Sequence, residues 1–450
     1  MLAIVVAVLI SPIVAFIGWS RIEAARLDRA LDAIEARHEP LDIAEFELKP
    51  ATSEQREASH AYAQAMKVIG DQPMTTSQTV TATNAIEQLC TSPADSSSQS
   101  EQVRILRSFE DPFAPAFEAL DRATGLDAAG WDEGDRPQRM SMEEMRPRKL
   151  GRLNAIRIAR LACTGHGDEA ADALLATLRL RRMIPLSFFS GNTVGSAHSL
   201  HVLLTFNSPD PVLLQKIQTE YERAADDQAL EKRLRFRRAQ WLYIMLPGVV
   251  SDLPPGYAAA RVNPLGAIVM RLARPMRDHG AVGELREFDD AFGAVSQPWP
   301  AKLDAATAIT QKYRFTQSQS RRPGVVERLT RPFAAHFAGV SLEGAVMNAA
   351  EALASARASV GAVAVARYSR AHEGAQPASL RDLVPQYLSG PLIDPYTGKE
   401  MKYLHDGRTF KVYSVGINRQ DDGGKWDQTS DLQESRRGNP PDIRIIVGGR

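Results

Sequence analysis

Acidic and glycine residues gather near the C-terminal end of the chain, and they are the best candidates for chemistry. The stretch Asp421-Asp-Gly-Gly424 combines carboxylates with flexible backbone carbonyls, and calcium prefers six to eight oxygen ligands of this kind. The carboxylates available to one cation are Asp421, Asp422, Asp427, Asp431 and Asp442. Since Lys425 and Arg436 could neutralise these carboxylates, the pattern predicts either a calcium site or a salt-bridged turn.

Three other groups of residues carry weaker signals. His198 and His201 are three apart in a helical pattern, which would put two metal ligands on one helix face. No matched carboxylate stands nearby, so a polar or packed face is favoured. The basic run from Lys232 to Arg238 could touch phosphate, but an exposed helical face is favoured for it. The turn Gly165-His-Gly-Asp168 is better explained as a connection between helices than as a reactive turn.

The chain lacks the short motifs of common enzyme classes. It contains no Gly-rich phosphate-binding loop, no Gly-x-Ser-x-Gly elbow and no His-Glu-x-x-His zinc motif. The formal net charge is zero, so no global field favours a nucleic acid partner. We therefore predict a non-enzyme that binds protein partners and not nucleic acid, and the sequence identifies no small-molecule substrate.

The chain has two cysteines, Cys90 and Cys163. Two buried free thiols are favoured over a single disulfide, which would require an oxidising compartment.

An apolar run at the start of the sequence predicts a membrane helix. Residues Met1 to Trp19 include no charged side chain. As a helix they would span roughly 28 Å, close to the ~30 Å hydrocarbon thickness of a bilayer. Trp19 fits an interfacial position. A signal anchor is favoured over a cleaved signal peptide, because no clean cleavage site follows the run, and over a buried core helix.

Helical patterns dominate residues 20–340. Leu150 to Cys163 and Asp168 to Ile184 are predicted to pair like the hairpin of tetratricopeptide repeats, with small residues such as Ala170 at their contact. No repeat of about 34 residues accompanies this pair, so the likeness concerns architecture alone. Residues 247–264 are rich in Pro and Gly and form a candidate break.

The C-terminal region predicts a small α+β unit. One helical stripe steps by three and four and consists of Val346, Ala349, Leu353, Ala356, Val360 and Val363. Two strand patterns, Met401 to Leu404 and Thr409 to Ser414, flank Asp406-Gly407, which suits a tight hairpin turn. Ile443 to Val447 is a third candidate strand.

This region resembles the globular part of type II secretion pseudopilins, especially the major pseudopilin. The matching residues are Asp394, Pro395 and Gly398, then Tyr413, Ser414 and Gly416, then Asp421 to Gly424, and finally Asp442 with Ile443. The resemblance implies a helix packed on a small antiparallel sheet, and a calcium ion held by Asp421, Asp422 and Asp442. The chain departs from pilins at its start, which has no Gly-aromatic-Glu motif, and in the insertion of Lys425 to Pro441 before Asp442. The whole arrangement is similar to bacterial proteins with an N-terminal anchor, a helical middle and a pilin-like end.

We therefore expect a mainly α protein in three parts: a transmembrane signal anchor over 1–19, a helical region with a tetratricopeptide-like hairpin over 20–340, and a pseudopilin-like α+β domain over 341–450. The expected location is a single-pass membrane protein whose bulk is extracytoplasmic, in the periplasm. The expected role is binding or assembly, linked to type II secretion or to another envelope apparatus. The alternatives are an envelope enzyme whose site is assembled from distant residues of the helical region, and a structural spacer.

Overall fold

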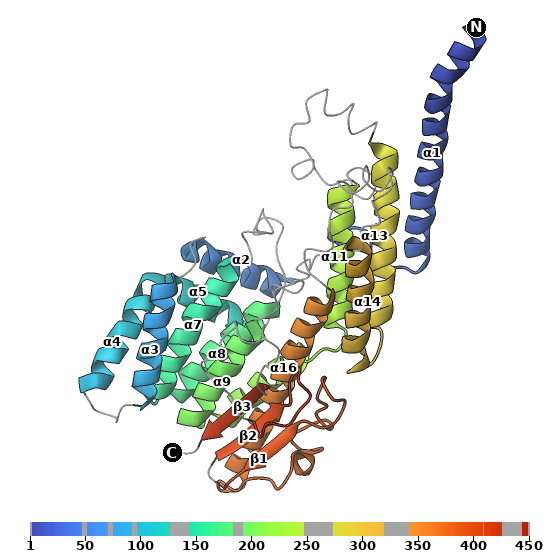
Figure 1. Ribbon diagram of the computed structural model, residues 1–450. Helices are drawn as coiled ribbons and strands as arrows, with labels where there is room; N and C mark the ends of the chain where they lie inside the picture. Colours follow the sequence, from blue (N-terminus) through green and yellow to red (C-terminus); the bar gives the residue numbers. More distant parts are fainter. Residues whose placement is uncertain are drawn as a thin grey trace. The chain divides into compact units, whose positions relative to one another are not determined.

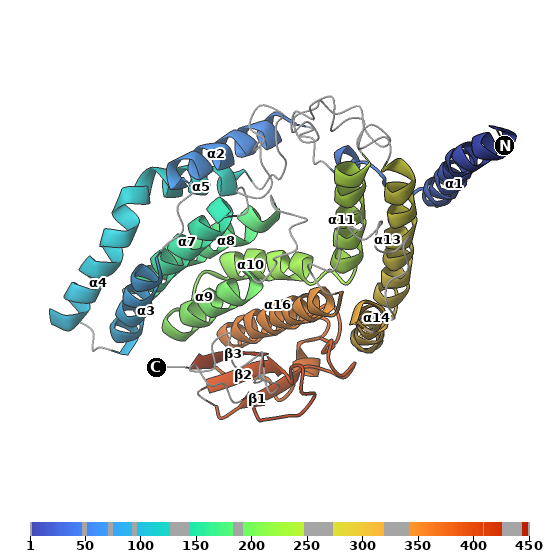
Figure 2. The ribbon, with the colours of Figure 1, turned by 45° about the horizontal axis from the view of Figure 1, so that its top comes forward.

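A computed structural model describes residues 2–46, 52–70, 75–91, 97–126, 145–182, 192–246, 273–318, 342–407, 409–424 and 443–448. These residues form a mainly helical protein with a small antiparallel sheet near the C-terminus, as expected (Figures 1 and 2). The chain divides into two compact units. Unit 1 comprises Met1–Glu47 and Gln228–Val346, and unit 2 comprises Leu48–Asp227 and Met347–Arg450. Each unit therefore combines two separate stretches of the chain, whereas the sequence patterns suggested three consecutive parts.

Unit 1 is a group of helices built around α1. Its elements are α1 (Leu2–Ala36), η1 (Ile43–Phe46), α11 (Ala229–Met245), α13 (Arg274–Val295), α14 (Ala301–Ser318) and the first residues of α16 (Leu342–Ala371). Two side-chain contacts join α1 and the residue after it to α13, one between Glu23 and His279 at 3.3 Å and one between Arg37 and Asp289 at 3.2 Å. The order of these contacts shows that α1 and α13 run in the same direction, side by side (Figure 1).

Unit 2 begins with helices that pack in two connected cores. Its elements are α2 (Ser53–Ile69), α3 (Thr76–Thr91), α4 (Ser97–Glu110), η2 (Asp111–Phe113), α5 (Ala114–Gly125), α7 (Met145–Cys163), α8 (Gly167–Arg182), α9 (Asn192–Phe206), α10 (Pro211–Ala224), the rest of α16, η4 (Leu380–Leu383), β1 (Lys402–His405), β2 (Thr409–Ser414) and β3 (Ile443–Gly448). Local signals start several helices. Thr52 and Gln55 form a capping box before α2, and Asp210 caps α10 ahead of Pro211.

The predicted hairpin of α7 and α8 is present. Ala170 and its neighbours Ala171 and Ala173 are fully buried or nearly so, so the two helices approach closely. Asn154 on α7 donates from Nδ2 to the carbonyl of Ala173 at 2.6 Å and to the hydroxyl of Thr177 at 2.8 Å. A buried polar side chain therefore fixes the register of the two helices.

Among the residues whose side chains the structure describes, which exclude the first nine of the chain, one helix is long and apolar enough to cross a membrane, and it is α16. Most of its apolar stretch is buried inside the protein, which is the behaviour of a core helix. The predicted stripe is largely confirmed, because Val346, Leu353, Ala356, Val360 and Val363 are buried and Ala349 is half-buried. Ser355 and Ser359, which lie outside this stripe, are buried as well. The helix is covered on more than one face, so its amphipathic pattern is weak.

The sheet has the order β1-β2-β3 and is antiparallel throughout. The predicted hairpin is confirmed, because Gly407 has φ +89° and Asp406 accepts a hydrogen bond from the amide of Thr409 at 2.6 Å. The third strand lies where it was predicted, with Ile443 opposite Ser414. The sheet and α16 share one core with residues of α7, α8, α9 and α10. The C-terminal α+β region is thus an integral part of unit 2.

The expectation of free thiols is wrong for Cys163, at the end of α7, which is disulfide-bonded. No cysteine in the described part of the chain is free. The one other cysteine of the sequence is Cys90, in α3, and α3 packs against α7. No local pattern of the sequence indicates that Cys163 is disulfide-bonded.

Candidate functional site

The acidic loop after β2 is held by hydrogen-bond donors of the protein. Asp421 Oδ1 accepts from the hydroxyl of Tyr413 at 2.8 Å and from the amide of Gly423 at 3.1 Å, and Asp421 Oδ2 lies 3.1 Å from the ammonium of Lys402. Partial burial alone would raise the pKa of Asp421, but the hydrogen bonds from Tyr413 and Lys402 outweigh it and hold that pKa below its ordinary value. Asp422 accepts from Asn418 Nδ2 at 2.9 Å.

A calcium ion bound by Asp421 would have to replace some of these contacts. The two oxygens of Asp421 already face an ammonium, a hydroxyl and an amide, and a bound cation would have to compete with Lys402. Within the described ranges, no group of three or more His, Cys, Asp or Glu side chains is placed to hold a metal. Asp427, Asp431 and Asp442 lie outside the described residues, so the calcium hypothesis for Asp421, Asp422 and Asp442 stays a prediction.

Asp394, the first residue of the Asp-Pro-x-x-Gly segment, has a structural role. Its side chain is buried and accepts from the amide of Tyr396 at 2.9 Å, the hydroxyl of Ser414 at 2.9 Å and the amide of Val415 at 3.0 Å. Gly398 has φ +68°, and its amide donates a hydrogen bond to the carbonyl of Asp394 at 2.8 Å. The motif residues Asp394, Gly398 and Ser414 therefore form one hydrogen-bonded turn that attaches the segment before β1 to the end of β2.

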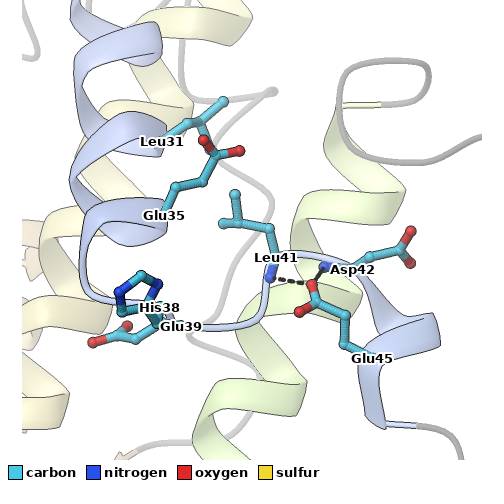
Figure 3. A pocket seen from close by; sticks show the side chains of 7 residues that line it. All are labelled: Leu31, Glu35, His38, Glu39, Leu41, Asp42 and Glu45. Carbon is cyan, nitrogen blue, oxygen red and sulfur yellow. Dashed lines mark hydrogen bonds between the residues drawn. The ribbon is translucent and has the colours of Figure 1, made fainter.

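An acidic pocket of about 490 Å³ lies where α1 ends (Figure 3). Its lining residues are Leu31, Glu35, His38, Glu39, Leu41, Asp42 and Glu45. Glu45 accepts from the amides of Leu41 and Asp42, both at 3.0 Å, so this carboxylate closes the turn that leads into η1. The pocket would attract a cationic group. However, Glu45 already accepts hydrogen bonds from backbone amides, and Glu39 accepts them from two arginines.

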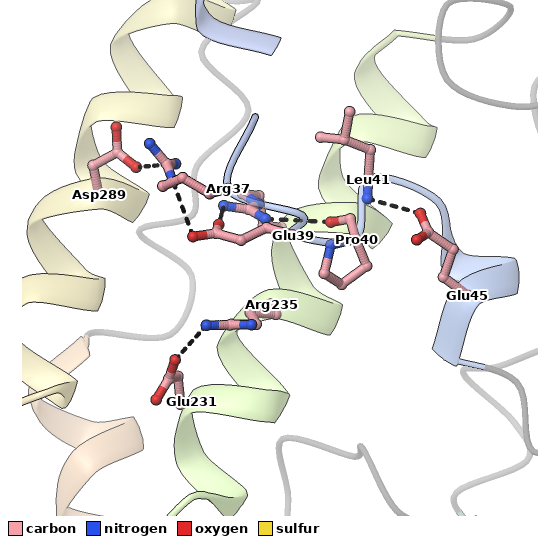
Figure 4. A network of polar contacts seen from close by, with 9 residues as sticks. Arg37, Glu39, Pro40, Leu41, Glu45, Glu231, Arg235 and Asp289 are labelled. Atoms are coloured by element: carbon pink, nitrogen blue, oxygen red, sulfur yellow. Dashed lines mark hydrogen bonds and ion pairs between the residues drawn. The ribbon is translucent and has the colours of Figure 1, made fainter. Parts of the chain in front are cut away.

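Those two arginines form a polar network beside the pocket (Figure 4). Arg238 is fully buried, donates to Glu39 at 2.6 Å and to the carbonyl of Pro40 at 3.2 Å, and lies 5.0 Å from the ring centre of Phe292. Arg37 donates to Glu39 at 2.9 Å. Burial raises the pKa of Glu39, but the hydrogen bonds from Arg238 and Arg37 outweigh it and lower the net pKa. The basic run is therefore not simply an exposed helical face, since its last residue ties α11 to the turn after α1.

The two histidines of α9 do not form a metal centre with their described neighbours. The rings of His198 and His201 are 6.1 Å apart at a tilt of 48°, and the described residues bring no third ligand to them. Burial and the neighbouring His201 lower the pKa of His198. His198 itself is exposed and His201 is half-buried, so the two histidines lie on a polar face of α9.

An uncovered apolar surface on α1 is the feature with the clearest functional meaning. Ile10, Ile13, Val14 and Ile17 are each 47–60% exposed. Among the side chains of α1 that the structure describes, from Ile10 onward, the first buried one is Glu23, and Leu27, Leu31 and Ile34 follow. Large apolar side chains gathered on one exposed segment indicate an interaction with an apolar partner. The apolar run of the sequence pointed to this segment, whereas the boundary at Glu23 required the structure.

No family model, no curated protein and no solved structure matches this chain.

Proposed function

We propose that the protein is a single-pass membrane protein of the bacterial envelope, with its bulk outside the cytoplasm, where it acts in binding or assembly. The observation that carries the proposal is the uncovered apolar segment of α1. Helix α1 continues without interruption from Leu2 to Ala36. From Leu2 to about Arg21 its length is roughly 30 Å, which matches the hydrocarbon core of a bilayer.

The contrast between α1 and α16 supports this assignment. Both helices contain long apolar stretches, but the apolar side chains of α16 are mostly buried within the protein, whereas Ile13 and Val14 of α1 are 58% and 60% exposed. Burying such surface in lipid is worth about 25 cal/mol per Å². Pro12, within this segment, is compatible with a membrane helix because such helices tolerate proline.

The disulfide of Cys163 supports an extracytoplasmic location, because disulfides persist in oxidising compartments. Arg21, Arg26 and Arg29 follow the apolar segment, and the positive-inside rule would favour the cytoplasm for this side. We give the disulfide more weight, because the pseudopilin resemblance also indicates the periplasmic side.

The assembly role is supported by the C-terminal sheet. Its motif residues include the Asp394 turn and the acidic loop between β2 and β3, in the order that resembles major pseudopilins. β1 is an edge strand of the sheet, and its Leu404 is exposed. An exposed edge strand is a common place for a protein partner to bind. Type II secretion or a related envelope apparatus is the proposed setting.

Carbonate extraction of membranes tests the anchor. The full chain should remain in the membrane pellet, and Ile10→Lys with Ile13→Lys should release it, because a charged residue near the bilayer centre costs about 2.5–3.5 kcal/mol. The matched control changes Val80 and Val212 to Lys, since these are comparably exposed in unit 2, and it should stay in the pellet. Uncleaved wild-type protein in the soluble fraction would rule the anchor out. Protease protection in intact spheroplasts would separately contradict the extracytoplasmic side.

A further inference from the structure

The end of unit 1 from which the apolar segment of α1 projects is rich in arginine. Because α1 and α13 run in the same direction, the start of α13 lies at this end. His279 contacts Glu23, and Arg274 lies five residues earlier in α13, about 7 Å closer to the projecting segment. Arg274 is thus near the level of Trp19, where the proposed membrane helix meets its interface.

The charges at this end are not balanced. Two carboxylates, Glu23 and Asp278, are almost fully buried. Glu23 lies 2.8 Å from Arg26, and Asp278 lies 2.9 Å from Arg277 and 3.4 Å from Arg274. Arg21 is a further exposed cation. Arg26, Arg274 and Arg277 therefore lie against two carboxylates that are hidden from solvent, and Arg21 adds a fourth positive charge. The accessible surface of the described residues at this end is positive.

The exposed arginines are oriented toward solvent despite their ion pairs. The side chain of Arg26 is 48% exposed and that of Arg274 is 59% exposed. Within one turn beyond Arg26 on α1, the exposed Asp28 and Arg29 offset each other. The positive surface is therefore confined to the end next to the apolar segment.

We propose that Arg21, Arg26 and Arg274 form a collar that binds anionic phospholipid headgroups of the bilayer in which α1 is anchored. This inference rests on the proposed anchor. Two observations select lipid as the occupant: the collar is continuous with the apolar segment of α1, and its charge is opposite to that of an anionic headgroup. Arginine suits this contact because its planar guanidinium can donate two hydrogen bonds to one phosphate. The contact would fix unit 1 against the membrane surface.

Hydrogen exchange in nanodiscs tests the collar with the full chain. The first amides of α13 have no helical acceptor, so their exchange reports what covers this end. Nanodiscs of phosphatidylcholine are compared with nanodiscs that also contain phosphatidylglycerol. Exchange at the start of α13 should be slower with the anionic lipid, by roughly fivefold, the factor that one arginine near an anionic surface provides.

The variant Arg26→Gln with Arg274→Gln should lose this lipid dependence and remain in the nanodisc fraction. The matched control is Arg37→Gln with Lys312→Gln, which removes two exposed, ion-paired cations of unit 1, with Arg37 at the opposite end of the α1–α13 pair. The control should keep the lipid dependence. Arg26→Lys with Arg274→Lys preserves charge and should keep it too, which separates lost charge from lost folding.

Each other outcome counts against the collar. Equal exchange in both lipids, with the protein in the nanodisc fraction, would overturn the collar and leave the anchor intact. Inorganic phosphate that reproduces the slowing in phosphatidylcholine discs would assign the arginines to a free anion. Loss of lipid dependence in the lysine variant would show that charge is not its basis. Failure of the protein to enter nanodiscs would instead refute the anchor, and the collar with it.

Discussion

At the scale of single residues, Asp394 joins two backbone segments of unit 2. Its buried carboxylate accepts hydrogen bonds from Tyr396, Ser414 and Val415. An amide in its place has one acceptor oxygen, so at least one buried donor would lose its hydrogen-bond acceptor. We expect Asp394→Asn to lower the free energy of unfolding by about 2–3 kcal/mol, measured by urea denaturation. The control Glu400→Gln removes an exposed partner of Arg381 and should change stability little. Equal effects of both variants would refute the structural role.

Glu39 gives a prediction about pH. Its folded-state pKa is lowered mainly because the hydrogen bonds from Arg238 and Arg37 outweigh burial. A depressed carboxyl pKa adds stability above the unfolded-state pKa of about 4.3, and this stability is lost as pH falls through the folded-state value. Glu39→Gln should therefore destabilise the protein at neutral pH, and the difference from wild type should shrink below about pH 4.

Glu287 offers a control of opposite sign. Burial first, and the neighbouring Asp290 second, raise its pKa, so its ionised form opposes folding at neutral pH. Glu287→Gln should keep or increase stability near neutral pH, with no difference in acid. Melting temperatures of the two variants across pH measure both effects, and parallel pH profiles for Glu39→Gln and wild type would contradict the assignment of Glu39.

The acidic loop gives a third prediction at this scale. Lys402 occupies the position of a counter-ion to Asp421, so calcium and a chelator should give superimposable melting curves for the wild-type protein. Lys402→Met should lower the melting temperature, because Asp421 would lose its cationic partner. If calcium instead raises the melting temperature of the wild type and not that of Asp421→Asn with Asp422→Asn, this result would establish the calcium site. A bound ion stabilises the folded state by RT ln(1 + [L]/Kd).

At the scale of elements, α16 depends on a close approach to the sheet. A Cβ atom at Gly361 would lie 2.9 Å from Val412 Cγ1 and 3.1 Å from Leu392 Cδ1. Gly151 in α7 has no such neighbour within 4 Å. An alanine in a helix interior gains roughly 0.5–1 kcal/mol over glycine, so Gly151→Ala should stabilise the protein. Gly361→Ala should instead be less stable than Gly151→Ala by about 1–3 kcal/mol, because overpacking adds its cost. Calorimetry of the two variants measures the difference, and equal stabilisation would show that the sheet can move away.

The elements themselves were largely predictable from local sequence. The three and four spacing of Val346 to Val363 indicated α16, and Asp406-Gly407 indicated the hairpin, because both signals lie within a few residues. The buried Ser355 and Ser359 were not predicted, since serines on a second face carry no apolar signal. The burial of Arg238 was not predicted either, because its partner Glu39 is 199 residues away in sequence.

At the scale of the whole molecule, the long-range organisation was not predictable. Each unit joins two separated stretches, and the switch near Val346 and Met347 occurs inside one continuous helix, α16. No composition shift marks such a boundary, because the helix pattern runs through it. The apolar start of the chain was predictable from composition, but the place where α1 becomes buried depends on α13, more than two hundred residues away.

The disulfide of Cys163 gives the last prediction, since it links compartment to stability. The sequence leaves Cys90 as its partner, and a bond between them would close a loop of roughly 70 residues, worth about 4 kcal/mol in the chain-entropy description. Cys90→Ser with Cys163→Ser should lower the melting temperature, and a reductant should lower that of the wild type while leaving the variant unchanged. Denatured, unreduced protein isolated from the envelope should then bind no thiol reagent. Two reactive thiols in that protein would show that it stays reduced in the cell, and the extracytoplasmic location would lose the support that the disulfide provides.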